Sequence, residues 1–182
     1  MTNWYPTDPE MYEDVQTRWQ YFNVATKRSP EKRLQRLWQG SRDSARTPVQ
    51  WDGGENAGFT TGTPWFYVNE NYKQINVADQ ERDEDSVLNF YRKAVALRKS
   101  LSCVRNGNYT EHEKLSAKRY VYSREDDRQK ILVVCAFCGK DQKWKAPAGF
   151  DLNAAELALC NYKDPANSLL KPYETRVYLW KK

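Results

Sequence analysis

The sequence has few long apolar runs. The longest is ILVVCAFC at residues 131–138, whereas a helix that spans a membrane needs about 20 apolar residues. The first residues also lack the charged and apolar regions of a secretory signal peptide. We therefore expect no membrane partner.

The sequence also lacks a strong excess of one charge. Among its 182 residues, lysine and arginine exceed aspartate and glutamate by a formal net charge of +5, and the cationic residues are spread along the chain. Proteins that bind nucleic acid concentrate positive charge on one face or along one segment. We therefore expect no nucleic-acid partner.

Metal-binding and nucleophilic residues are scarce. The chain has four cysteines and one histidine, and Cys135 and Cys138 form a C-x-x-C inside a strand-like apolar run. This set does not complete a standard zinc site. We expect free thiols in a reducing cytosol, hence a cytoplasmic protein with no metal and no cofactor. His112 is conceivable as a general base, but no G-x-S-x-G motif accompanies it, and we expect an ordinary sheet position.

The most distinctive feature of the sequence is a long segment with several glycines, residues 41–77. It shows neither helical nor strand periodicity, yet it carries six aromatic residues, including Trp51, Trp65 and Tyr67. Loops of this length in compact domains are usually functional or disordered, and disordered segments are poor in aromatic residues. We expect an ordered loop that lies over another part of the protein.

Arg42 and Arg46 stand at the start of this loop, with Asp43 between them. In a helical turn this spacing puts both guanidinium groups on one face. Arginine donors suit carboxylates and vicinal hydroxyls, and aromatic rings cover the C–H face of a sugar. The pattern permits a sugar site, or a structural role in which both arginines pair with Asp43 or Asp52.

Helices are expected on both sides of the loop. Asp8 and Ser29 precede Pro-Glu pairs and mark two helix starts within residues 1–40. Residues 83–100 form the clearest helix, with Asp83 as its N-cap and Arg98 and Lys99 in its last turn. Each of these helices carries an apolar stripe, which we expect to be a packing face that needs a partner surface. The three stripes are Met11, Val15, Trp19 and Phe22; Leu34, Leu37 and Trp38; and Val87, Phe90, Tyr91, Ala94, Val95, Leu97 and Leu101.

The last part of the chain has a strand pattern. Short alternating or apolar segments separated by turn clusters predict an antiparallel β-sandwich. The expected strands are residues 107–113, 119–123, 130–137, 142–145, 155–160 and 175–180.

Four stretches of the sequence carry a resemblance to a known family. They read SRDSARTPVQW, NAGFTTGTPW, VNENYKQINV and DEDSVLNFYRKAVALRK. Together they resemble the C-terminal part of the α-glucosidases of glycoside hydrolase family 13, the group of oligo-1,6-glucosidases, isomaltases and maltases. The resemblance covers nearly the whole chain, with Val49 at a position where the family usually carries Met.

The resemblance implies an α+β fold in two parts. Residues 1–102 would be the C-terminal portion of a catalytic (β/α)8 TIM barrel with its active-site loop at 41–77, and residues 103–182 a C-terminal all-β sandwich domain. A complete barrel needs about 250 residues, so we expect a fragment whose partner is the missing barrel portion of the parent enzyme.

The resemblance also implies a function. Family members hydrolyse α-1,6- or α-1,4-glucosidic bonds of small oligosaccharides such as maltose and isomaltose by a retaining mechanism with two carboxylates. The family's catalytic carboxylates lie on earlier barrel strands, so no catalytic residue is assigned here and the chain alone is expected to be inactive. Arg46 is the expected substrate-binding residue, and Arg42 either joins it or braces the loop with Asp43. A related trehalose-6-phosphate hydrolase, a related sucrose isomerase, and a non-catalytic β-sandwich module that binds sugar or protein remain alternatives.

Overall fold

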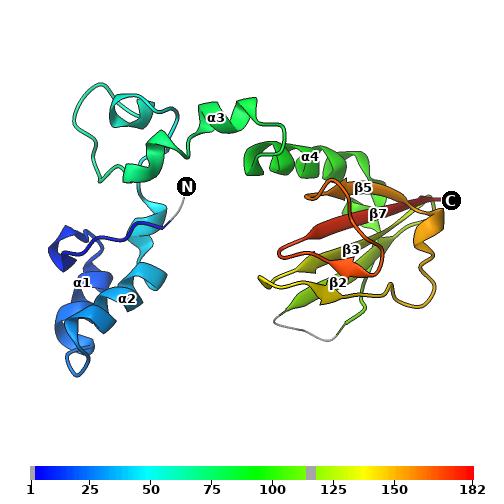
Figure 1. Cartoon of the computed structure of the whole chain (residues 1–182), viewed down its shortest axis with the longest axis horizontal. Coiled ribbons are helices and arrows are strands. Elements are labelled where there is room, and N and C mark those ends of the chain that lie inside the picture. The colour runs from blue at the N-terminus through cyan, green and yellow to red at the C-terminus, as the bar shows by residue number, and fades with distance from the viewer. Residues whose placement is uncertain (1–2, 114–117) are drawn as a thin grey trace. The chain divides into compact units, whose positions relative to one another are not determined.

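The computed structural model describes residues 3–113 and 118–182. The chain divides into two compact units, Met1–Asp83 and Glu84–Lys182, which we treat separately (Figure 1). No helix within the described ranges has the length and apolar character needed to cross a membrane.

The first unit contains short helices joined by ordered turns. Side chains of Asp8, Asp14 and Ser29 each accept a backbone N–H at a helix start. The starts predicted at Asp8 and Ser29 are confirmed, but the helix at Asp8 is a single 3-10 turn and α1 begins separately after Asp14. The helices are η1 (Pro9–Met11), α1 (Val15–Trp19), the π-helix η2 (Gln20–Val24), α2 (Pro30–Gly40), η3 (Arg42–Ala45), η4 (Glu55–Gly58), η5 (Glu70–Lys73) and α3 (Val77–Arg82).

The core of this unit is largely aromatic. Its buried members are Trp4, Tyr12, Tyr21, Leu37 and Phe66, with Leu34 and Trp38 of α2 packed against them. The α2 stripe is therefore covered within the chain. The other N-terminal stripe is covered only at Met11, which packs on the same core, because Val15 is 80% exposed and Trp19 57% exposed.

The loop 41–77 is ordered by turns and by side-chain hydrogen bonds, as its aromatic content predicts. The Gln50 amide donates to the Asn71 side chain at 3.0 Å and also to the Ile75 carbonyl. Asn76 then caps α3 by accepting the Asp79 amide at 2.9 Å. These contacts tie Gln50 to the last residues of the loop and lead directly into α3, a helix that the sequence pattern did not reveal.

The second unit begins with α4 (Val87–Ser100) and α5 (Ser102–Asn106). The predicted start of this helix at Asp83 is wrong. Ser86 is the N-cap and accepts the Asn89 amide at 3.2 Å, whereas Asp83 has extended backbone angles and closes α3. Both residues are good caps by composition, and the end of α3 decides between them.

A five-stranded antiparallel sheet forms the centre of the second unit, in the order β1-β2-β3-β7-β5, and β4 pairs with β6 separately (Figure 1). The antiparallel sheet is thus confirmed, and all six predicted strands exist. The strands are β1 (Asn108–Glu111), β2 (Arg119–Glu125), β3 (Gln129–Ala136), β4 (Gln142–Lys143), β5 (Glu156–Cys160), β6 (Leu169–Leu170) and β7 (Thr175–Lys181).

Strand β3 is buried on both faces of the sheet. Ile131 and Val133 pack with Leu97 and Leu101, from α4 and its C-cap, on one face. The alternate residues of β3 pack with Trp144 and the segment around it on the other. Because successive side chains of a strand point to opposite faces of the sheet, β3 contributes to a hydrophobic core on each face. The α4 stripe is covered at Leu97 and Leu101, while Val87 remains 77% exposed.

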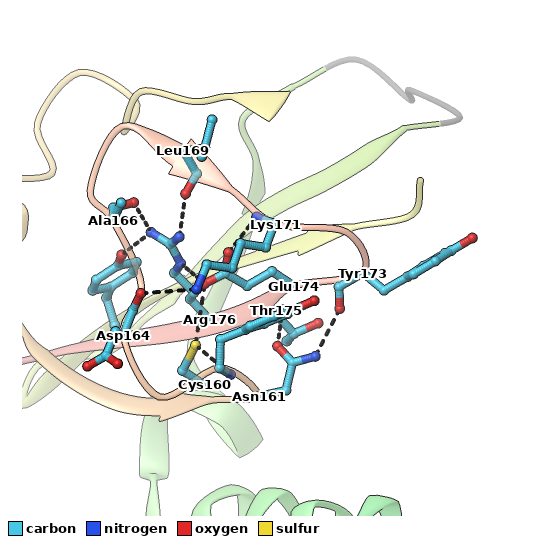
Figure 2. A network of polar contacts seen from close by, with 12 residues as sticks. Cys160, Asn161, Asp164, Ala166, Leu169, Lys171, Tyr173, Glu174, Thr175 and Arg176 are labelled. Carbon is cyan, nitrogen blue, oxygen red and sulfur yellow. Dashed lines mark hydrogen bonds and ion pairs between the residues drawn. The ribbon is translucent and has the colours of Figure 1, made fainter. Parts of the chain in front are cut away.

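A buried ion pair fixes the loop between β5 and β7 (Figure 2). Arg176 and Glu174 have no exposed side-chain surface, and Arg176 Nε donates to Glu174 Oε1 at 2.8 Å. The other guanidinium nitrogens donate to the carbonyls of Ala166 and Leu169. Glu174 accepts the Lys171 amide at 2.7 Å. Both charges therefore have the partners that a buried ion pair requires.

Candidate active-site loop

Arg42 and Arg46 converge on one carboxylate. Arg42 is the first residue of the single turn η3 and Arg46 is its C-cap, and this turn follows α2 directly. Arg42 Nε lies 3.7 Å and Arg46 Nη2 lies 3.6 Å from the same oxygen, Asp14 Oδ1. Arg42 also donates to the Gln16 side chain. The two guanidinium groups are thus brought together, as their spacing predicts, against the start of α1.

Asp43 holds η3 against this helix start. Its side chain is fully buried, and its Oδ2 accepts the backbone amides of Glu13 at 2.9 Å and Asp14 at 3.0 Å. Its Oδ1 forms an ion pair with Arg46 Nη1 at 3.5 Å. Asp43 therefore joins two segments about 30 residues apart and also anchors Arg46.

Asp14 is kept charged despite being buried. Burial acts to raise its pKa, but hydrogen bonds from the Thr17 hydroxyl and amide, together with Arg42 and Arg46, lower the pKa overall. The hydrogen bonds from Thr17 are 2.8 and 2.9 Å long. A permanent carboxylate at this point lets two arginines lie close together.

Tyr12 is a buried residue near Asp43. Its hydroxyl is buried without a hydrogen-bond partner in the described part of the chain. Burial and the nearby negative charge of Asp43 raise the pKa of Tyr12 to about 12. Tyr12 is therefore neutral at physiological pH and has no role as a base.

The arginines remain open to solvent. The Arg46 side chain is 39% exposed and the Arg42 side chain 61% exposed, so each keeps donors for an external group. A groove of about 540 Å³ in the same unit is lined by Glu13, the residue before Asp14, and by Asn56, Trp65 and Tyr67 among others, although neither arginine lines it. Fixed guanidinium donors and exposed aromatic rings can bind a polyhydroxylated ligand.

The alternative that the arginines pair with Asp43 or Asp52 in a structural role holds in part. Arg46 pairs with Asp43, but Asp52 accepts the Gly54 amide at 2.8 Å and lies beneath Gly58 in a separate turn. Sequence reasoning missed Asp14. The only local signal was Thr17 three residues later, the spacing of a helix cap.

The cysteines and the histidine form no second site within the described residues. All four cysteines are free thiols, as expected, and no group of three or more potential ligands in the described ranges is placed to hold a metal. His112 Nε2 lies 2.8 Å from the Ser123 hydroxyl. Burial and then Lys130 lower the pKa of His112, in keeping with a neutral structural imidazole.

Comparison with known proteins places this geometry in context. The family model described as the catalytic domain of alpha amylase matches residues 9–107, which include the arginine cluster. The probable oligo-1,6-glucosidase 2 of Bacillus subtilis is 38% identical over 98% of this chain and 33% of its own length. Trehalose-6-phosphate hydrolase of the same organism is also 38% identical, over 98% of this chain and 33% of its own length. The chain thus spans about a third of these relatives.

Solved structures agree in fold. Trehalose-6-phosphate hydrolase of Bacillus licheniformis matches with a TM-score of 0.90 at 36% identity, over 100% of this chain and 34% of that protein. Isomaltulose synthase of Klebsiella sp. LX3 matches with a TM-score of 0.87 at 31% identity, over 99% of this chain and 34% of that protein.

Proposed function

The chain belongs to the alpha-amylase family, and from this premise we propose that it serves as the C-terminal part of an α-glucosidase. The whole enzyme hydrolyses α-1,6- or α-1,4-glucosidic bonds of small oligosaccharides with retention of configuration. Residues 1–102 contribute the end of the (β/α)8 barrel and its active-site loop, and residues 103–182 contribute a β-sandwich. The sequence resemblance and the oligo-1,6-glucosidase relatives support this assignment.

In this proposal the chemistry is divided within the enzyme. Two carboxylates of the remaining barrel act as nucleophile and general acid, about 5–5.5 Å apart as retention requires. Arg46 donates to hydroxyls of the terminal glucose and helps to orient the glucose. Arg42 shares the Asp14 carboxylate with Arg46 and limits the movement of both side chains.

The observation that carries the proposal is how Arg46 is held. Asp14 and Asp43 both approach its guanidinium within 3.6 Å, yet 39% of the side chain stays exposed. A group fixed before the substrate arrives loses little entropy when it binds, which favours orientation of a sugar. The exposed part of the side chain leaves Arg46 accessible to a substrate.

The test uses a chimeric enzyme. Residues 1–182 replace the corresponding third of the probable oligo-1,6-glucosidase 2 of B. subtilis, and hydrolysis of isomaltose and of a chromogenic α-glucoside is measured. We expect activity in the chimera and none in the 182-residue chain alone. Turnover by the purified chain alone would contradict the proposed division of the chemistry.

Arg46→Gln in the chimera should lower kcat/KM about 10²-fold, because a charged donor to the substrate is lost. Arg105→Gln is the control, since Arg105 is an exposed arginine in the last turn of α5. Circular dichroism establishes that each variant is folded. A folded Arg46→Gln chimera with unchanged kcat/KM would contradict the role of Arg46.

A carbohydrate-binding module is the second candidate function. A cavity of about 710 Å³ in the second unit is lined by Trp144, Phe150, Asn153 and Asn167 among others, and rings with amide groups suit a sugar. Calorimetric titration of the chain with maltose and isomaltose separates the candidates. Binding that Asn167→Ala abolishes and Arg46→Gln leaves intact would favour the module.

A further inference from the structure

Three arginines surround a small cavity that the proposed function does not use. The cavity has a volume of about 280 Å³ and lies in the first unit, between η2 and α2. Arg28, Arg33 and Arg36 line it together with Trp19 and Val24, and the lining residues include no aspartate or glutamate. This combination of three cations and an apolar wall is absent from the other cavities described above.

Arg33 is a fixed part of the cavity wall. Its Nε donates to the Arg28 carbonyl at 3.0 Å and its Nη1 donates to the Tyr21 carbonyl at 3.3 Å. Its guanidinium also lies over the Tyr21 ring, 5.1 Å from the ring centre. These contacts join the turn before α2 to the π-helix along one wall of the cavity.

The positive charges of Arg28 and Arg36 are not paired with a carboxylate in the described part of the chain. Within the described residues, neither side chain has a hydrogen bond or an ion pair. Arg36 lies one turn after Arg33 on the same face of α2. Residues 27–36 contain five cationic side chains and one carboxylate, that of Glu31, so this segment has a locally positive potential that attracts anions.

The remaining wall is apolar. Trp19 is 57% exposed and Val24 is 55% exposed, which leaves their side chains available to a ligand. The volume lies just below the range of about 300–1,000 Å³ typical of drug-sized ligands. A ligand that fills this space is therefore small. It has an anionic end that binds the arginines and an apolar body about the size of one ring that contacts the apolar wall.

We propose that this cavity binds a small organic phosphate. The phosphate is held by Arg28 and Arg36, whose planar donor groups match its oxygens in paired hydrogen bonds. The body of the ligand lies on Trp19 and Val24 beside the fixed Arg33. The inference is independent of the glucosidase assignment, because it rests on a different set of residues and its test measures no hydrolysis.

The experiment is a calorimetric titration of the full 182-residue chain with phenyl phosphate and, separately, with inorganic phosphate. We expect phenyl phosphate to bind about tenfold more tightly, because the ring buries apolar surface on Trp19 and Val24. Arg28→Gln and Arg36→Gln should each raise the Kd for phenyl phosphate about threefold to tenfold, since each removes charged donors. Arg33→Gln is avoided because Arg33 supports the fold.

Arg105→Gln is the matched control, because it removes the same charge from an exposed position in the second unit. It should leave the Kd unchanged. As a second measurement, phenyl phosphate should raise the Tm of the first unit in the wild-type chain and raise that of Arg36→Gln less. Equal affinity for the two phosphates would overturn the proposal, as would an equal weakening by Arg105→Gln.

Discussion

Glu174 and Arg176 form a fully buried ion pair at the start of β7, and the loss of this pair should lower the stability of the protein strongly. Glu174→Gln leaves the Arg176 charge buried without a counter-charge, which should lower the free energy of unfolding by about 3–5 kcal/mol. Urea unfolding followed by circular dichroism measures this. Glu156→Gln is the control, because Glu156 and Lys181 form an exposed pair and its loss should cost less than about 1 kcal/mol. Equal losses in the two variants would contradict the prediction.

The Glu174 carboxylate should also make the stability of the protein depend on pH. Burial acts to raise the pKa of Glu174, but hydrogen bonds from Arg176 and the Lys171 amide lower the pKa overall. The unfolded chain, with a glutamate pKa of about 4.3, therefore takes up the proton first as pH falls. The stabilisation is complete at neutral pH and is lost as pH falls below that value through the folded pKa. Unfolding free energies measured across this range should fall less steeply for Glu174→Gln than for the wild type, and parallel curves would contradict this.

The candidate site was predictable from sequence only for residues that lie close together in the chain. Arg42 and Arg46 were found because a motif places them four residues apart. Asp14 was not, because about 30 residues separate it from η3 and nothing local reveals that Asp43 binds its backbone amide. Tertiary contacts of this kind arise from packing, which residue spacing does not encode.

At the scale of elements, Gly107 allows α5 to pass close to β2. A Cβ on this residue would lie 2.5 Å from the Cys103 carbonyl oxygen and 2.7 Å from the Glu125 carbonyl oxygen. Gly107→Ala should therefore push two backbones apart and cost about 1–3 kcal/mol of stability. Gly40→Ala is the control, because no atom lies within 4 Å of the place that a Cβ would take on Gly40. Gly40 is the last residue of α2, where alanine should be neutral or stabilising. Thermal unfolding compares the two variants, and a Gly107→Ala protein as stable as the wild type would refute the close approach.

The strands were largely predictable because alternation is a local signal. Each predicted segment contains a strand, whereas β6 was missed because its two residues, Leu169 and Leu170, are too few to alternate. Helix boundaries were harder. Asp83 and Ser86 are both good N-caps, and the choice between them depends on the end of α3. Local preference thus identifies an element more reliably than it identifies the first residue.

At the scale of the whole molecule, the two units differ in how well their apolar surface is covered. The second has cores on both faces of its sheet. The first has one aromatic core and leaves Val15, Trp19 and Phe22 exposed on consecutive turns. Exposed apolar groups on this scale mark an interaction surface. In the proposed enzyme we expect the rest of the barrel to pack on Val15 and Phe22.

The unequal cores predict that the units unfold separately. Contacts fall mainly within Met1–Asp83 and within Glu84–Lys182, so differential scanning calorimetry of the chain should show two transitions, the first unit melting at the lower temperature. Leu37→Ala, which opens the aromatic core, should lower only the first Tm. Val133→Ala, which opens the sheet core, should lower only the second. Each variant serves as the control for the other, because both shorten a buried apolar side chain. A single transition with equal calorimetric and van't Hoff enthalpies, shifted by both substitutions, would mean that the two units unfold together.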